Sequence, residues 1–251
     1  MNTVEFGKEN SQIIILLHGG GLSWWNYREA ATLLSSQYHV VIPLLDGHAG
    51  SNFPFESIET AAEHIHTWIT QNYGGKVRAI GGLSLGGQIL TELLTIAPDI
   101  CKFAVIESAL VIPMKLTNLL VGPMVSMSYG LTQKRWFSKI QFQQLHMPSA
   151  LFEEYYQDTC KILKKDMIAF LKSNSSYTLK DSFGNTSAKV LIAVGAKEIP
   201  IMKRSAALLH RSLKGSEMHI LTGFQHGDLS INHPEDYTKL LKSLIGESHR
   251  I

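Results

Sequence analysis

Short runs of large aliphatic residues alternate with longer amphipathic stretches along most of the chain. Ile13–Leu17 is a run of five consecutive large aliphatics, typical of a strand buried on both faces of a sheet. We expect strands at Ile13–Leu17, His39–Leu44, Val77–Gly81, Lys102–Glu107, Val190–Val194 and Met218–Leu221. The expected helices are Trp24–Ser36, one from Ser57 to Gly74, Leu85–Ile96, Ser205–Leu213 and Pro234–Ile245. This alternation predicts an α/β protein with a mostly parallel sheet flanked by helices.

The alternation stops between residues 109 and 185. This segment has no run typical of a buried strand, and its helical stretches are rich in Met, Leu, Tyr and Phe and interrupted by proline. We therefore predict a core domain made of residues 1–108 and 186–251, with residues 109–185 inserted as a helical unit that packs against it.

A Gly-x-Ser-x-Gly pattern at Gly82, Ser84 and Gly86 lies between an expected strand and an expected helix. A sharp strand-to-helix turn of this kind lifts the serine hydroxyl above the sheet, and a Cβ at the flanking positions would clash. The pattern alone is weak, but its place at a strand–helix junction favours Ser84 as a nucleophile.

His18-Gly19-Gly20-Gly21 directly follows the first expected strand. An enzyme that transfers acyl groups must stabilise a developing oxyanion, and rigid backbone N–H groups do this well. We expect the amides of Gly20 and Leu85 to form this oxyanion hole. His18 itself is interpreted as a structural histidine.

Among the 11 histidines, His226 stands out because it lies in a Gly-flanked loop after the last expected strand. We predict that it is the base that activates Ser84. A third group must orient the imidazole, and Glu198, in the loop after the strand Val190–Val194, is the favoured acid. Glu107, at the end of the preceding strand, and Asp228 remain alternatives.

Composition narrows the class of protein further. A chain of 251 residues with a net charge of +2 can bury its own core, and no Lys/Arg run indicates a nucleic-acid surface. Cys101 and Cys160 lack the spacing of a metal site and fit free thiols in a reducing compartment. No signal peptide or membrane span is visible. We expect a cytoplasmic protein with no metal, no cofactor and no stable membrane insertion, either a monomer or a homodimer.

On these residues the chain resembles the α/β-hydrolase superfamily over nearly its whole length. The order Ser84, Glu198, His226 matches the family's nucleophile, acid and base, and His18-Gly19-Gly20 is similar to its oxyanion loop. The segment Asp46–Ser51 is similar to the family's Asp-x-x-Gly-x-Gly-x-Ser loop, and residues 109–185 resemble its helical cap. The glutamate is a departure, because aspartate is the commoner acid. Only about a dozen residues precede the first buried strand, so we expect shortened or partly missing outer N-terminal strands.

The resemblance implies hydrolysis of a carboxylic ester, or a related acyl bond, in a small and rather apolar substrate. The double glycine Gly86-Gly87 resembles the branch that holds small esterases, C–C hydrolases and the menaquinone-pathway lyase. A lyase or C–C hydrolase with the same triad, and a non-catalytic ligand-binding homologue, therefore remain alternatives. We expect the substrate between the elbow and the cap, in contact with Gly21, Met114, Met124 and Met127. Ile112–Met127 is amphipathic enough to touch a lipid surface, but a helix lying on the active-site mouth has the same pattern and is favoured.

Overall fold

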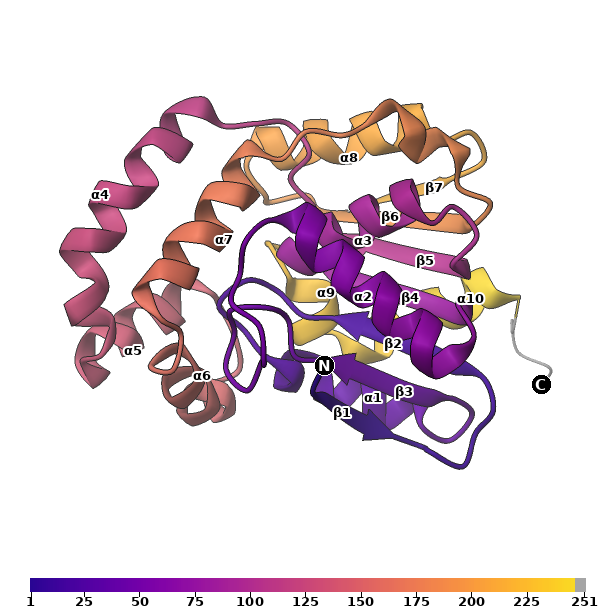
Figure 1. The fold of residues 1–251 in the computed structure, drawn as a ribbon, viewed down its shortest axis with the longest axis horizontal. Helices are drawn as coiled ribbons and strands as arrows, with labels where there is room; N and C mark the ends of the chain where they lie inside the picture. The colour runs from indigo at the N-terminus through magenta and orange to yellow at the C-terminus, as the bar shows by residue number, and fades with distance from the viewer. Residues whose placement is uncertain (247–251) are drawn as a thin grey trace.

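The computed structural model describes residues 1–246, which form a seven-stranded sheet flanked by helices (Figure 1). The strand order is β1-β3-β2-β4-β5-β6-β7; β1 is antiparallel to β3, and all the other neighbours are parallel. The strands are β1 (Thr3–Phe6), β2 (Ile13–Leu17), β3 (His39–Pro43), β4 (Val77–Leu83), β5 (Cys101–Glu107), β6 (Lys189–Gly195) and β7 (Glu217–Leu221). This confirms the predicted α/β class and the mostly parallel sheet.

The continuous aliphatic runs arise because both faces of the sheet are covered. In β2, Ile15 and Leu17 belong to one hydrophobic core, whereas Ile14 and Leu16 belong to the other. The first core is closed by α2 (Ile58–Tyr73), α3 (Leu85–Ile96) and α8 (Pro200–Ser212). The second is closed by the 3-10 helix η1 (Trp24–Tyr27), α1 (Arg28–Leu34), α9 (Asp228–Ile231) and α10 (Pro234–Ile245).

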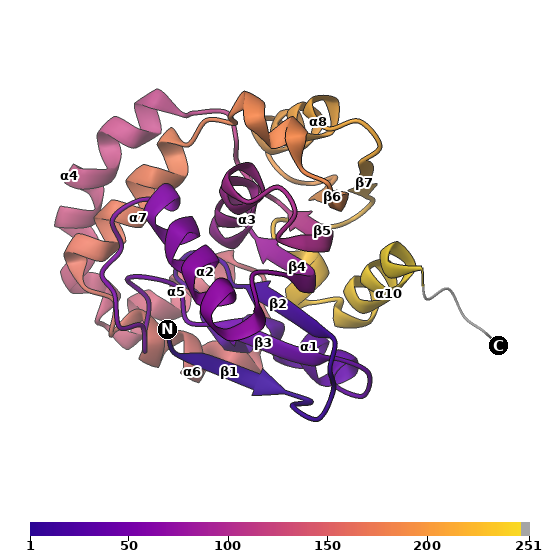
Figure 2. The same ribbon diagram turned by 45° about the vertical axis from the view of Figure 1, so that its right-hand side comes forward.

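Residues 109–185 contain no strand and are all described by the structure. Their helices are α4 (Lys115–Thr132), α5 (Arg135–Gln144), η2 (Ser149–Leu151), α6 (Phe152–Thr159), α7 (Lys164–Ser176) and η3 (Asp181–Asn185). Helices α4 to α7 stand together beside the sheet, with α4 outermost and α7 between α4 and the core (Figures 1 and 2). The short helix η3 packs instead on α3.

Most element boundaries lie within one or two residues of those predicted, because caps mark them. Ser57 accepts a hydrogen bond from the Thr60 amide at the start of α2, and Gly74 ends this helix at φ 66°. Helix α8 begins at Pro200 rather than Ser205, since proline suits the first helical turn. The short strand β1 and helix α9 were not predicted. Among residues 1–246, no helix has the length and hydropathy needed to cross a membrane.

Candidate active site

Ser84 sits at the sharp turn between β4 and α3, in a backbone conformation that is unusual for a residue with a side chain. Its φ is 53° and its ψ is −110°. Two backbone hydrogen bonds hold this turn: the Ser84 amide donates to the Glu107 carbonyl at 2.9 Å, and the Ser84 carbonyl accepts from the Gln88 amide at 2.9 Å. Backbone strain of this kind costs about 1–3 kcal/mol and is characteristic of functional sites.

Close backbone contacts explain the glycines on either side of Ser84. A Cβ at Gly82 would lie 2.4 Å from the Gly86 carbonyl oxygen, and one at Gly86 would lie 2.1 Å from the Leu17 carbonyl oxygen. Both contacts are with backbone atoms, which cannot move aside as a flexible side chain would. The turn therefore requires glycine at both positions.

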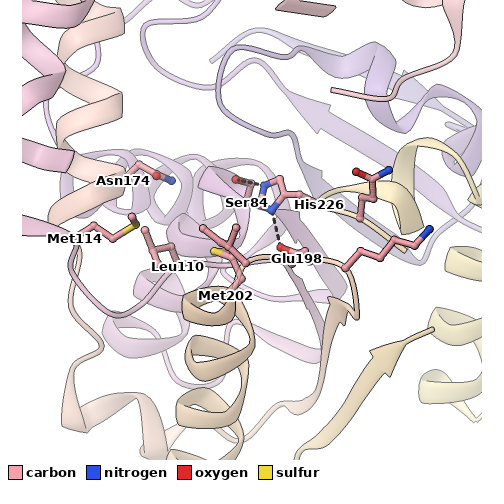
Figure 3. Close-up of a pocket in the computed structure, with 10 residues that line it drawn as sticks. Ser84, Leu110, Met114, Asn174, Glu198, Met202 and His226 are labelled. Carbon is pink, nitrogen blue, oxygen red and sulfur yellow. Dashed lines mark hydrogen bonds and ion pairs between the residues drawn. The ribbon is translucent and has the colours of Figure 1, made fainter. Parts of the chain in front are cut away.

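The structure brings Ser84, His226 and Glu198 together in one hydrogen-bonded chain (Figure 3). His226 Nε2 lies 3.0 Å from Ser84 Oγ, and His226 Nδ1 lies 2.8 Å from Glu198 Oε2. A neutral imidazole satisfies both bonds when Nδ1–H donates to Glu198 and Nε2 accepts from the Ser84 hydroxyl. The imidazole is half exposed, whereas the Glu198 side chain is only 1% exposed.

Glu198 is kept ionised by its hydrogen-bond donors. Burial on its own would raise the pKa of this carboxyl, but the bonds from His226, Ser108 and the Gly195 amide outweigh it and lower the pKa below its ordinary value. The Ser108 hydroxyl and the Gly195 amide donate to Oε1 at 2.7 and 2.8 Å, which leaves Oε2 for His226. The carboxylate thus has a fixed orientation toward the imidazole.

The two alternative acids have other partners. Glu107 is buried, and its Oε1 accepts the Ser230 amide at 3.3 Å. Burial raises the pKa of Glu107 to about 7. Asp228 accepts the Gln225 amide at 2.6 Å and the Asn232 side chain at 2.7 Å, so it braces the loop that carries His226. Neither carboxylate hydrogen-bonds to the imidazole in this structure.

We expect Glu107→Gln to change how stability depends on pH. Because the folded pKa of Glu107 (about 7) exceeds the ordinary value of 4.5, the native state binds more protons than the unfolded state between these pH values. Wild-type stability should therefore fall as pH rises through this window, by up to about 3 kcal/mol from this group. The amide of glutamine does not titrate, so the variant lacks this pH dependence of stability. Urea unfolding should show that the free energy of unfolding of the variant, relative to wild type, is higher at pH 8 than at pH 5. The same difference between variant and wild type at both pH values would contradict this prediction.

Two buried histidines order the glycine loop after β2. The Leu45 amide donates to His18 Nε2 at 3.1 Å, and the Gly21 amide donates to His48 Nε2 at 2.9 Å. Burial lowers the pKa of His18 to about 3 and that of His48 to about 4, so both are neutral. The Gly21 amide is therefore paired with His48, and the expected contact of Gly21 with the substrate stays a prediction.

Gly20 differs from its neighbours in this loop because it is exposed. Among the described residues, no backbone or side-chain acceptor takes its N–H. A Cβ at Gly20 would lie 3.4 Å from Leu85 Cβ, so the two residues are adjacent. Leu85 is the first residue of α3, where a helix has no internal partner for its N–H. Both predicted oxyanion donors thus lie side by side next to Ser84.

A cavity of about 380 Å³ opens beside Ser84, within the size range of small-molecule sites. Its lining residues are Ser84, Leu110, Met114, Asn174, Lys197, Glu198, Ile199, Met202, Gln225 and His226. Figure 3 shows how Leu110, Met114, Asn174 and Met202 gather beside the Ser84 hydroxyl. Among residues 1–246, no group of three or more His, Cys, Asp or Glu side chains is arranged to hold a metal ion.

Only one of the three methionines expected at the substrate reaches this cavity. Met114 lines it, whereas Met124 and Met127 are 62% and 85% exposed and are not among its lining residues. The reason is helical geometry: Met114 caps the N-terminus of α4, and the other two side chains point outward from later turns. The expectation that Met124 and Met127 contact the substrate is therefore corrected.

Sequence reasoning missed the residues that hold the cavity wall in place. Gln88, fully buried on α3, donates to the carbonyls of Leu110 (2.6 Å) and Asn174 (2.9 Å) and accepts from the Asn174 side chain at 2.7 Å. This network fastens α7 to the core next to Ser84. Leu110, Asn174 and Met202 belong to no motif, so only the fold could place them there. Ser108, which orients Glu198, directly follows Glu107 at the end of β5. This position at a strand end was the feature of the sequence that could have indicated its role.

Comparison with known proteins agrees with this geometry. The sequence model of the alpha/beta hydrolase family matches residues 14–211, which is most of the chain. The chain belongs to the alpha/beta hydrolase family and is a hydrolase. This confirms the resemblance drawn from the motifs.

Named relatives include esterases. The chain is 25% identical over 248 residues to a pimeloyl-[acyl-carrier protein] methyl ester esterase of Neisseria meningitidis, covering 92% of this chain and 93% of the relative. The fold is similar to an esterase from Exiguobacterium antarcticum (17% identity, 97% and 94% coverage, TM-score 0.82). It is also similar to the enol-lactonase of Burkholderia xenovorans LB400 (13% identity, 98% and 96% coverage, TM-score 0.81). At these identities the solved structures establish the fold alone.

Proposed function

We propose that this protein hydrolyses carboxylic esters of small, rather apolar substrates through an acyl-enzyme formed on Ser84. The observation that carries the proposal is the continuous hydrogen-bonded chain from Ser84 Oγ through His226 to the buried carboxylate of Glu198. A serine hydroxyl is a weak nucleophile until a neighbouring base takes its proton, and the base needs a third group to orient it.

The first half of the proposed reaction uses this chain directly. His226 Nε2 accepts the hydroxyl proton as Ser84 Oγ attacks the ester carbonyl carbon, and Glu198 stabilises the resulting imidazolium. The carbonyl oxygen becomes an oxyanion, to which the Gly20 and Leu85 amides donate. Each such donor contributes about 3–4 kcal/mol to lowering the barrier in enzymes of this type.

The second half returns the enzyme to its starting state. The imidazolium protonates the leaving alcohol, which departs and leaves the acyl group on Ser84. Water then attacks this ester, with His226 again taking the proton, and the carboxylic acid is released. Glu198 stays ionised throughout, which fits the lowered pKa of its carboxyl.

The cavity can accommodate an apolar acyl or alcohol group of the substrate. Leu110, Met114, Ile199 and Met202 provide apolar surface, and the volume of about 380 Å³ limits the substrate to a small molecule or a short chain. Because Met114 caps α4 and Asn174 lies on α7, we propose that residues 109–185 act as a helical cap over the site. The esterase named among the relatives agrees with ester chemistry.

A series of p-nitrophenyl esters from acetate to decanoate tests this proposal. We expect the highest kcat/KM on a short or medium acyl chain, with a decline as the chain outgrows the cavity. Met114→Ala enlarges the cavity and should move the optimum to longer chains. Met124→Ala is the matched control: it removes the same side chain from an exposed position outside the cavity and should leave the series unchanged. No turnover of any ester by wild type would refute ester hydrolysis.

A further inference from the structure

A row of large apolar side chains lies exposed along α4. We call it the α4 stripe, and its members are Leu116, Leu119, Leu120, Met124, Met127 and Leu131. Their spacing of three or four residues places them on one side of the helix. Leu116 is 71% exposed, Leu119 72% and Met127 85%, which is far from the usual burial of such side chains. A contiguous exposed apolar surface of this kind marks an interaction site.

The other side of α4 is the one that packs on the protein. Val121, Val125 and Thr132 are buried there, and the Asn118 side chain donates to the Lys172 carbonyl of α7 at 2.7 Å. Helix α4 is also the outermost helix in both ribbon views (Figures 1 and 2). The stripe therefore faces outward and does not lie on the active-site mouth, contrary to the reading favoured for Ile112–Met127 from the sequence.

The charged residues in the sequence segment that carries the stripe all have one sign. Between Glu107 and Glu153 the sequence has no Asp or Glu and four basic residues, Lys115, Lys134, Arg135 and Lys139. Lys115 is the first residue of α4 and Lys134 follows its end, so a cation flanks the stripe at each end. Exposed Trp136 and Ile140 on the next helix add aromatic and aliphatic surface. Arg135 pairs with Glu153, whereas Lys115, Lys134 and Lys139 have no salt-bridge partner among the described residues.

We propose that the α4 stripe docks this protein onto an anionic lipid surface, with α4 lying in the plane of the membrane interface. An apolar helix face flanked by lysines, with a tryptophan nearby, is the pattern by which helices bind such interfaces. Anionic headgroups complement the lysines, and the acyl boundary takes the leucines and methionines. This is peripheral docking and is independent of the proposed ester hydrolysis.

Docking would also bring the cavity close to the lipid. Met114, the N-cap residue of α4, lines the cavity beside Ser84, two residues before the stripe begins at Leu116. When α4 lies in the interface, its N-terminal end, where Met114 lines the cavity, therefore lies at the membrane surface.

Co-sedimentation with sucrose-loaded vesicles of phosphatidylglycerol and phosphatidylcholine in equal parts tests the proposal. Wild type should bind these vesicles, and binding should weaken about tenfold on pure phosphatidylcholine or in about 0.5 M salt. Leu119→Gln/Met127→Gln removes the two most exposed members of the stripe and should lower the partition coefficient by about 30-fold or more. Both positions are on the surface, so the fold should survive, which circular dichroism checks.

Leu33→Gln/Ile220→Gln is the matched control, because it changes two exposed aliphatic residues on α1 and β7, outside the stripe. It should bind vesicles as wild type does. Equal binding by wild type and the stripe variant would overturn the proposal. The proposal would also be overturned if wild type does not bind vesicles but is a dimer in solution while the stripe variant is a monomer. The stripe would then bind a second copy of this chain.

Discussion

Replacing Ser84 by alanine is expected to lower kcat for ester hydrolysis by about 10⁴-fold or more. The loss should be this large because the hydroxyl is the group that forms the proposed acyl-enzyme, with Ser84 Oγ 3.0 Å from His226 Nε2. The remaining oxyanion donors and binding surface would leave a small residual rate over water. Steady-state kinetics on the best ester of the series measure this directly.

Ser36→Ala provides the control for this loss, since Ser36 is an exposed serine after α1, remote in the fold from the turn at Ser84. It should keep wild-type kcat and KM. Ser84→Ala should keep the wild-type unfolding midpoint to within a few degrees, because it deletes one partly exposed hydroxyl. A Ser84→Ala enzyme with more than a tenth of the wild-type activity would mean that the proposed nucleophile is wrong.

Glu198→Gln is expected to lower kcat by about 10³–10⁴-fold with a smaller effect on KM. The amide is nearly isosteric, but it cannot stabilise the imidazolium or hold the Nδ1–H tautomer of His226. The pKa of Glu198 lies below its ordinary value, so the carboxylate is already ionised well below neutral pH. The variant should therefore remain impaired at every pH between about 6 and 9, because wild-type Glu198 is ionised throughout this range.

Glu107→Gln is the matched control for that loss, because Glu107 ends β5 beside β6 but accepts no hydrogen bond from the imidazole. It should keep kcat to within a few-fold while showing the stability change described above. A large loss of kcat in Glu107→Gln, with near-normal turnover in Glu198→Gln, would assign the acid to β5 instead.

The sheet was predictable because its strands are buried on both faces and therefore appear as unbroken aliphatic runs, as in Ile13–Leu17. The pairing of Ser84 with His226 was predictable for a related reason. Parallel strands bring their carboxyl ends to one edge of the sheet, so residues in the loops after β4 and β7 can meet there.

The acid of the triad was harder to predict than the nucleophile and the base. Glu107 ends β5, and Glu198 lies in the loop after the neighbouring strand β6, so their positions in the sequence separate the two candidates poorly. What separates them is their hydrogen bonding: Ser108 and the Gly195 amide turn Glu198 toward His226, while Glu107 is buried against the Ser230 amide. These contacts depend on side-chain orientations, which no spacing in the sequence encodes.

The face of α4 was misjudged for a physical reason as well. Periodicity shows that one side of a helix is apolar, but it does not show which neighbour, if any, covers that side. In the structure α4 packs on α7 with Val121 and Val125 buried, and the α4 stripe has no covering element among residues 1–246.

Labelling with a fluorophosphonate probe, followed by peptide mass spectrometry, tests the central claim most directly. The probe reacts with a serine whose hydroxyl is activated by a neighbouring base. We predict one adduct, on the peptide that contains Ser84, formed rapidly in wild type, strongly slowed in His226→Ala and absent in Ser84→Ala. No adduct in wild type, or an adduct on another serine, would contradict the account.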